Sequence, residues 1–175
     1  MERGEEVLRK RGEVLDRWFQ AVAATYPQET AVFLRREQDH FGNPVGHAVR
    51  MALALLFDGL AAGRPAAELA PALDGLVRIR AVQEFSPAAA VAFVFDLKPI
   101  LRGECPAITE AERTELEAAI DRLALQAFDV YMQCRETLFQ IRVREIKDLQ
   151  LIAARGGGCA PAQCGGSQST AREGR

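Results

Sequence analysis

The chain has 175 residues and a formal net charge of −2, with 49% hydrophobic and 26% charged residues. This composition is typical of one globular domain with its own core. Because the net charge is slightly negative, the composition does not indicate a basic surface that binds nucleic acid. No apolar run reaches the roughly 18 residues of a membrane-spanning helix. The N-terminus is charged and has no apolar stretch like that of a secretory signal, so we expect a cytoplasmic protein.

Apolar residues recur at spacings of three and four along most of the chain, which predicts helices instead of strands. Proline and glycine mark the breaks between them. Pro71, inside the fourth helix, either bends that helix or marks its true start, and Pro99 is expected to distort the end of the fifth. The pattern predicts an all-α bundle of about six helices, over residues 5–25, 28–37, 43–62, 65–82, 86–101 and 109–155.

The last predicted helix begins at a capping box, Thr109-Glu110-Ala111-Glu112, in which the threonine hydroxyl and the glutamate carboxylate each accept from a free N–H group. No breaker follows for more than forty residues. At about 1.5 Å per residue such a helix is about 70 Å long, longer than a small domain is wide. We therefore expect its C-terminal part to project from the bundle.

Beyond Phe139 the apolar residues of this helix narrow to a stripe of Val143, Ile146 and Leu149. Charged residues flank the stripe, among them Arg142 and Arg144, which are candidate contacts for a partner. A narrow stripe between charges is typical of a short two-helix seam. The pattern predicts a homodimer formed through this helix.

Residues 156–175, GGGCAPAQCGGSQSTAREGR, differ in composition from everything before them. Glycine, serine and alanine bury too little surface to offset the entropy of ordering. We expect residues 1–155 to form one domain and residues 156–175 a flexible tail. Cys159 and Cys164 in the tail are either incidental, a redox-responsive pair, or half of a metal site shared across a dimer, and we predict no metal because two thiolates do not close a site.

Arg78 and Arg80 lie on either side of Ile79 in an apolar segment. Charges in such segments must be paired or face water, and residues two apart on a helix point about 200° away from each other. One of the two arginines is therefore expected to be exposed. Both belong either to structural ion pairs or to a site that contacts a small anionic signal or a partner protein.

No other residues predict chemistry. His40 and His47 are read as surface or helix-end residues and not as haem or metal ligands. We predict no cofactor and no catalytic activity, because no nucleophile, acid–base pair or phosphate loop has the required spacing. Cys134 is expected to be buried and Cys105 partly exposed. Five aromatic residues are expected in the core: Trp18, Phe85, Phe93, Phe95 and Phe128.

Four stretches of the chain carry a resemblance to a known family: residues 16–37 (DRWFQAVAATYPQETAVFLRRE), 41–50 (FGNPVGHAVR), 76–98 (LVRIRAVQEFSPAAAVAFVFDLK) and 120–147 (IDRLALQAFDVYMQCRETLFQIRVREIK). From about residue 7 to 150 the chain resembles the N-terminal domain of the RsbT co-antagonist protein RsbRD. The resemblance implies a helical sensor-like domain, globin-like without haem in some relatives. In those relatives a long helix leads to a STAS domain, which docks the RsbT kinase.

The resemblance thus implies a dimeric signalling input module without catalytic residues. After the long helix this sequence leaves no room for a STAS domain, so we expect a stand-alone sensor or adaptor that acts through protein–protein interaction. STAS-domain or kinase components of a stress-signalling system are the expected partners. The alternative is a redox-linked accessory protein of a respiratory or sulfur-metabolising complex, with the Cys159/Cys164 tail as its working end.

Overall fold

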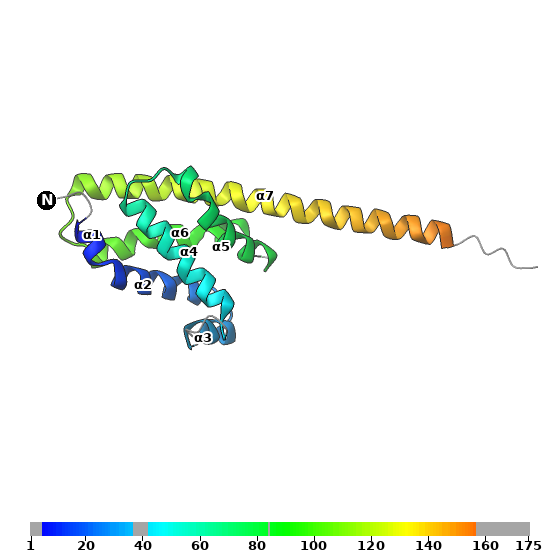
Figure 1. The fold of residues 1–175 in the computed structure, drawn as a ribbon, viewed down its shortest axis with the longest axis horizontal. Helices are drawn as coiled ribbons and strands as arrows, with labels where there is room; N and C mark the ends of the chain where they lie inside the picture. Colours follow the sequence, from blue (N-terminus) through cyan, green and yellow to red (C-terminus); the bar gives the residue numbers. More distant parts are fainter. Residues whose placement is uncertain (1–4, 37–41, 84, 157–175) are drawn as a thin grey trace, which may run out of the picture. The chain divides into compact units, whose positions relative to one another are not determined.

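The computed structural model describes residues 5–36, 42–83 and 85–156. Over these residues the chain is helical and contains no strand, which confirms the predicted all-α class (Figure 1). The predicted tail lies outside the described residues. The elements in chain order are α1 Glu5–Arg9, α2 Arg11–Ala24, α3 Gln28–Arg36, α4 Pro44–Ala61, the 3₁₀ turn η1 Ala66–Leu69, α5 Ala70–Val82, α6 Pro87–Glu104 and α7 Glu110–Gly156.

Most element boundaries agree with the prediction, and three differences have local causes. The first predicted helix is interrupted at Lys10, where φ is −92° and ψ is 9°. Pro71 stands in the first turn of α5 and marks its true start, because the residues before it form a 3₁₀ turn. Pro99 lies inside α6, which nevertheless continues to Glu104.

Asn43 joins two helices at the start of α4. Its side-chain oxygen accepts from the N–H of Gly46 at 2.8 Å, and its side-chain nitrogen donates to the carbonyl of Leu34 at 3.2 Å. The side chain is 1% exposed. Asn43 therefore caps α4, as is usual for an asparagine that precedes a proline at the first helical position, and also ties α4 to the end of α3, which the sequence does not reveal.

The chain divides into two compact units, Met1–Thr137 and Leu138–Arg175. In the first, α2 packs against α3, α4 and α6, and α4 packs against α5. In Figure 1, α6 lies beside the first part of α7, and α3 lies farthest from α7. Two ion pairs join α6 to α7: Lys98 with Asp121 at 2.6 Å and Arg102 with Glu117 at 2.8 Å. The predicted boundary at residue 155 coincides with the end of the described residues and stays a prediction.

Two of the predicted core aromatic residues and one cysteine were assigned wrongly. Trp18 and Phe93 are fully buried, but Phe95 is 44% exposed and Phe128 is 42% exposed. Their segments are apolar on nearly every side, so spacing does not reveal which face meets the core. Cys105, expected to be partly exposed, is 0% exposed, because its N–H bonds to the carbonyl of Leu101 and keeps it against the last turn of α6.

Phe85 is half-buried, and Cys134 is buried as predicted. Among the described residues one helix, α4, is long and apolar enough to cross a membrane, with a mean hydropathy of 1.2. A core helix has the same properties, and 44% of α4 is buried inside the first unit. Two of its charged residues are engaged there, since Asp58 pairs with Arg11 at 2.7 Å and Arg50 stacks on Phe19.

The second unit, by itself, is the C-terminal part of α7. None of its described side chains is buried. Its large apolar residues are more than half exposed at five positions: Phe139 62%, Ile146 55%, Leu149 65%, Leu151 55% and Ile152 67%. Most of the stability of a helix in a protein comes from packing of its apolar face, and these side chains have no such packing within the single chain.

The Asn43 cap leads to a prediction on two glycines. A Cβ atom at Gly46 would lie 2.7 Å from Asn43 Cγ, whereas a Cβ atom at Gly75 meets nothing within 4 Å. Gly46→Ala should displace the cap and lower the free energy of unfolding by about 1 kcal/mol. Gly75→Ala should raise it by about 0.5–1 kcal/mol, because alanine favours a helix. Urea unfolding followed by circular dichroism measures both, and equal effects of the two variants would contradict this role of Asn43.

Candidate functional site

The most unusual group in the first unit is the side chain of Arg80, which is 0% exposed. It lies in the last turn of α5. Leu73 and Val77, seven and three residues earlier, are fully buried on the same face. Because helix residues at these spacings share a face, the fold of α5 carries a guanidinium into a core where the pattern otherwise places leucine and valine.

Three aromatic rings surround this guanidinium. The central carbon, Cζ, lies 4.4 Å from the ring centroid of Phe85, 5.5 Å from that of Phe93 and 5.6 Å from that of Tyr26. Tyr26 and Phe85 also contact each other edge to face at 5.4 Å. Aromatic faces attract a cation, so the rings offset part of the cost of removing Arg80 from water.

The hydrogen bonds of Arg80 are incomplete. Nη2 donates to the carbonyl oxygen of Ala89 at 2.9 Å, but Nε and Nη1 are buried and have no acceptor among the described residues. The Tyr26 hydroxyl is buried beside them and interacts with the guanidinium, which partly opposes the lowering of the pKa of Arg80 by burial, but it forms no hydrogen bond of regular geometry with a described residue. A buried cation normally has both a carboxylate and a full set of acceptors, and neither is found in the part of the chain that the structure describes.

Burial dominates the electrostatics of the cluster. It lowers the pKa of Arg80 from its ordinary value, with Tyr26 and Asp96 acting in the opposite direction. It raises the pKa of the Asp96 carboxyl, and the positive charge of Arg80 only partly opposes this shift. Among the described acidic groups, Asp96 acts on Arg80, but no described carboxylate forms a salt bridge with Arg80 within 4.0 Å.

Two further hydrogen bonds hold the walls of the cluster in place. The indole N–H of Trp18, on α2, donates to the carbonyl of Phe93 at 2.6 Å. The hydroxyl of Tyr131, on α7, donates to the carbonyl of Phe85 at 2.6 Å. The Arg80 cluster, as we call Arg80 with Tyr26, Phe85, Phe93 and Asp96, is therefore built by the turn after α2, the end of α5, the turn before α6 and α6 itself. Trp18 on α2 and Tyr131 on α7 support it from outside.

The structure places the two arginines of α5, Arg78 and Arg80, in different environments. Arg78 pairs with Asp74 at 2.6 Å and its side chain is 59% exposed, which confirms that only one of the two faces the core. Arg142 and Arg144 lie exposed in the second unit and do not belong to the cluster. Tyr26 went unnoticed as a site residue, because the Tyr-Pro pair signals only the end of a helix.

The other candidate residues give no second site. His47 is half-buried on α4. His40, Cys159 and Cys164 lie outside the described residues. Within the described ranges no three histidine, cysteine or acidic residues gather in a way that could hold a metal ion.

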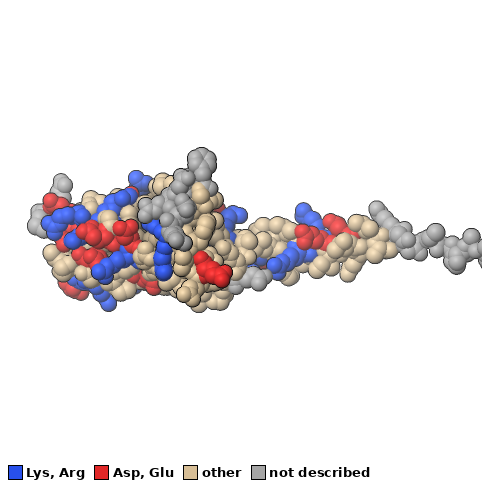
Figure 2. All heavy atoms as spheres, turned by 90° about the horizontal axis from the view of Figure 1, so that it is seen from below, with Lys and Arg blue, Asp and Glu red and all other residues tan. Residues whose placement is uncertain are grey.

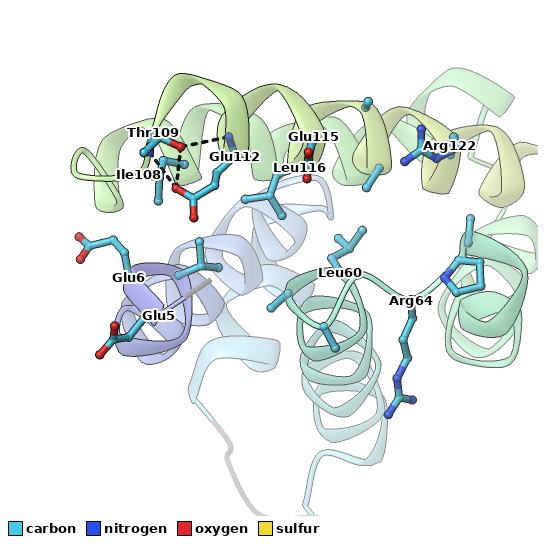
Figure 3. A pocket seen from close by; sticks show the side chains of 18 of the residues that line it. Glu5, Glu6, Leu60, Arg64, Ile108, Thr109, Glu112, Glu115, Leu116 and Arg122 are labelled. Atoms are coloured by element: carbon cyan, nitrogen blue, oxygen red, sulfur yellow. Dashed lines mark hydrogen bonds between the residues drawn. The ribbon is translucent and has the colours of Figure 1, made fainter. Parts of the chain in front are cut away.

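A surface pocket of about 1150 Å³ lies between α1, the end of α4 and the start of α7. Figure 3 shows Leu60 and Leu116 facing each other across it, with Arg64 pointing away. Two of its acidic groups are already engaged, since Glu112 accepts from Thr109 in the capping box and Glu6 pairs with Arg9. The lining offers no unpartnered polar group comparable with Arg80.

On the face seen in Figure 2, acidic and basic side chains alternate over the first unit without a large patch of one sign. Several of these charges form pairs, such as Arg11 with Asp58 and Arg102 with Glu117. Surface pairs of this kind contribute little to stability. The Arg80 cluster is therefore the electrostatic feature that distinguishes this unit.

Comparisons with known proteins agree with the helical pattern. The model of the family described as "RsbT co-antagonist protein rsbRD N-terminal domain" matches residues 12–146. A curated protein of Archaeoglobus fulgidus, described only as uncharacterized, is 28% identical over 87 residues, which are 49% of this chain and 57% of that protein. The match thus spans less than two thirds of that relative. No solved structure matches the chain significantly.

The raised pKa of Asp96 leads to a prediction on pH. Ionised Asp96 destabilises the fold at neutral pH because burial costs more than the attraction of Arg80 returns. Asp96→Asn should therefore raise the free energy of unfolding at pH 7, by an amount that shrinks as the pH falls through the folded pKa and the native carboxyl becomes neutral. Urea unfolding at a series of pH values tests this, and an Asn variant less stable than the native chain at pH 7 would contradict it.

Proposed function

We propose, because this chain belongs to the RsbT co-antagonist protein RsbRD N-terminal domain family, that it is a non-enzymatic signalling input domain. In this proposal the first unit receives a signal, and the C-terminal part of α7 contacts a partner. The same proposal includes a cytoplasmic location, as the composition predicts. The family is associated with stress signalling and is not a family of enzymes.

One observation carries the proposal beyond the family: the apolar residues of the second unit are exposed. Phe139, Ile146 and Leu149 are each more than half exposed. They recur at spacings of seven and three, which are the spacings of a two-helix seam. An apolar surface of this kind on a helix without partners marks an interaction site.

The occupant we propose for this face is a second copy of the chain. A two-fold axis brings the same stripe of each copy together, so one stripe serves both sides of the interface. From Phe139 to Ile152 the stripe is only about 20 Å long, which by itself makes a weak pair. In the sequence the same spacing extends backwards through Met132, Phe128 and Leu125, all three of which are exposed in the first unit.

We predict that the chain is a dimer in solution and that Leu149→Glu makes it a monomer, because a carboxylate in the seam cannot be desolvated without a partner. Leu151→Glu is the matched control. Leu151 is also exposed, at 55%, but lies about 200° around the helix from Leu149. Light scattering at micromolar concentration measures the mass. A monomeric native chain, or equal masses for the two variants, would contradict the proposal.

Affinity capture from native cells tests the signalling role itself. We expect the tagged chain to recover STAS-domain proteins or a regulatory kinase, both with and without reductant, because helix packing does not depend on thiol chemistry. The Leu151→Glu variant should recover the same proteins as the native chain. Recovery of enzymes from unrelated pathways alone, with no STAS protein or kinase, would argue against the input-domain reading.

A further inference from the structure

We propose that Arg80 and Tyr26 form a buried binding site for one small monovalent anion, of the size of chloride or formate. The site lies in the first unit, where α5 meets the end of α2 and the start of α6. This inference goes beyond the proposed function and does not depend on it, since the site exists whether or not the chain signals.

The first argument is the number of donors without acceptors. A guanidinium carries five N–H groups, and Arg80 spends one on the carbonyl of Ala89. Nε and Nη1 are buried without an acceptor of regular geometry in the described part of the chain, and the Tyr26 hydroxyl, which interacts with the guanidinium, has no described acceptor for its own proton. Leaving a buried donor unpaired costs about 1–3 kcal/mol, more if the group is charged, so three such donors in one place indicate a missing acceptor.

The second argument is charge. A water molecule would accept a hydrogen bond but would not neutralise the guanidinium. The rings of Tyr26, Phe85 and Phe93 attract the cation, each by about 2 kcal/mol when desolvated, but they leave its N–H donors without acceptors. The penalty for burying an ion is several kcal/mol, and the nearby acid, Asp96, does not reach salt-bridge distance. An anion satisfies the donors and the charge together.

The third argument sets the size and charge of the ligand. The centroids of the aromatic rings lie 4.4–5.6 Å from Cζ of Arg80, so we infer that only a small ion can approach the guanidinium. Asp96 lies close enough to affect the pKa of Arg80, and its negative charge would repel a dianion. A halide or a one-carbon carboxylate fits these limits, whereas a phosphate ester or a nucleotide does not.

Thermal unfolding of the full chain, with sodium chloride or sodium formate added, tests the site. Sodium gluconate, whose anion is too large to enter, keeps the ionic strength constant. The midpoint of the native chain should rise with the logarithm of the chloride or formate concentration, by about 3 °C for each tenfold increase above the dissociation constant. Arg80→Met should abolish this dependence, and Tyr26→Phe should weaken it.

Arg78→Met is the matched control, because Arg78 is exposed, two residues away on the same helix, and should keep the full anion dependence. Bromide soaked into crystals of the native chain gives an independent readout, with an anomalous peak expected beside Arg80. That readout remains decisive if Arg80→Met fails to fold. The same salt response in the native chain and in Tyr26→Phe, or the absence of a bromide peak at Arg80, would overturn the proposal.

Discussion

The burial of one guanidinium constrains the first unit more than any other interaction. Arg80 cannot face water, because α5 places it on the same side as Leu73 and Val77. The surrounding helices must therefore supply what water would have supplied. Phe85 and Phe93 present their rings, Ala89 presents its carbonyl, and Tyr26 closes the remaining side. Together, the end of α2, the turn after α5 and the start of α6 enclose this charge.

The enclosing groups are held in turn by polar contacts from outside the cluster. Trp18 bonds to the carbonyl of Phe93, and Tyr131 bonds to the carbonyl of Phe85. Because both donors are on large rigid side chains, they fix the backbone that carries the aromatic walls. A ligand that changed the position of Phe85 would therefore change the environment of Tyr131 on α7.

The helix α7 contains two chemically different parts. Up to Cys134 one side of it is buried in the first unit, with Ile120, Leu123 and Ala127 almost fully covered. From Leu138 onward no described side chain is buried, although apolar residues continue at the same spacing. The sequence of the second part thus has the pattern of a packed helix without packing in the single chain. In the proposed function, a second copy of the chain packs against these apolar residues and covers them.

The sequence by itself determined the all-α class, most helix ends and the capping residues, because these depend on short-range rules of spacing, proline and hydrogen-bond capping. It also determined that Arg78 and Arg80 point in different directions, and that the chain resembles the family to which it belongs. It did not decide which arginine enters the core, or whether Phe95 and Phe128 face solvent. In segments that are apolar on all sides, the spacing of apolar residues does not indicate which side of the helix faces the core. Only the tertiary structure decided that Arg80 meets Tyr26, which is 54 residues earlier in the chain, because their contact depends on how α2, α5 and α6 pack and on no local pattern.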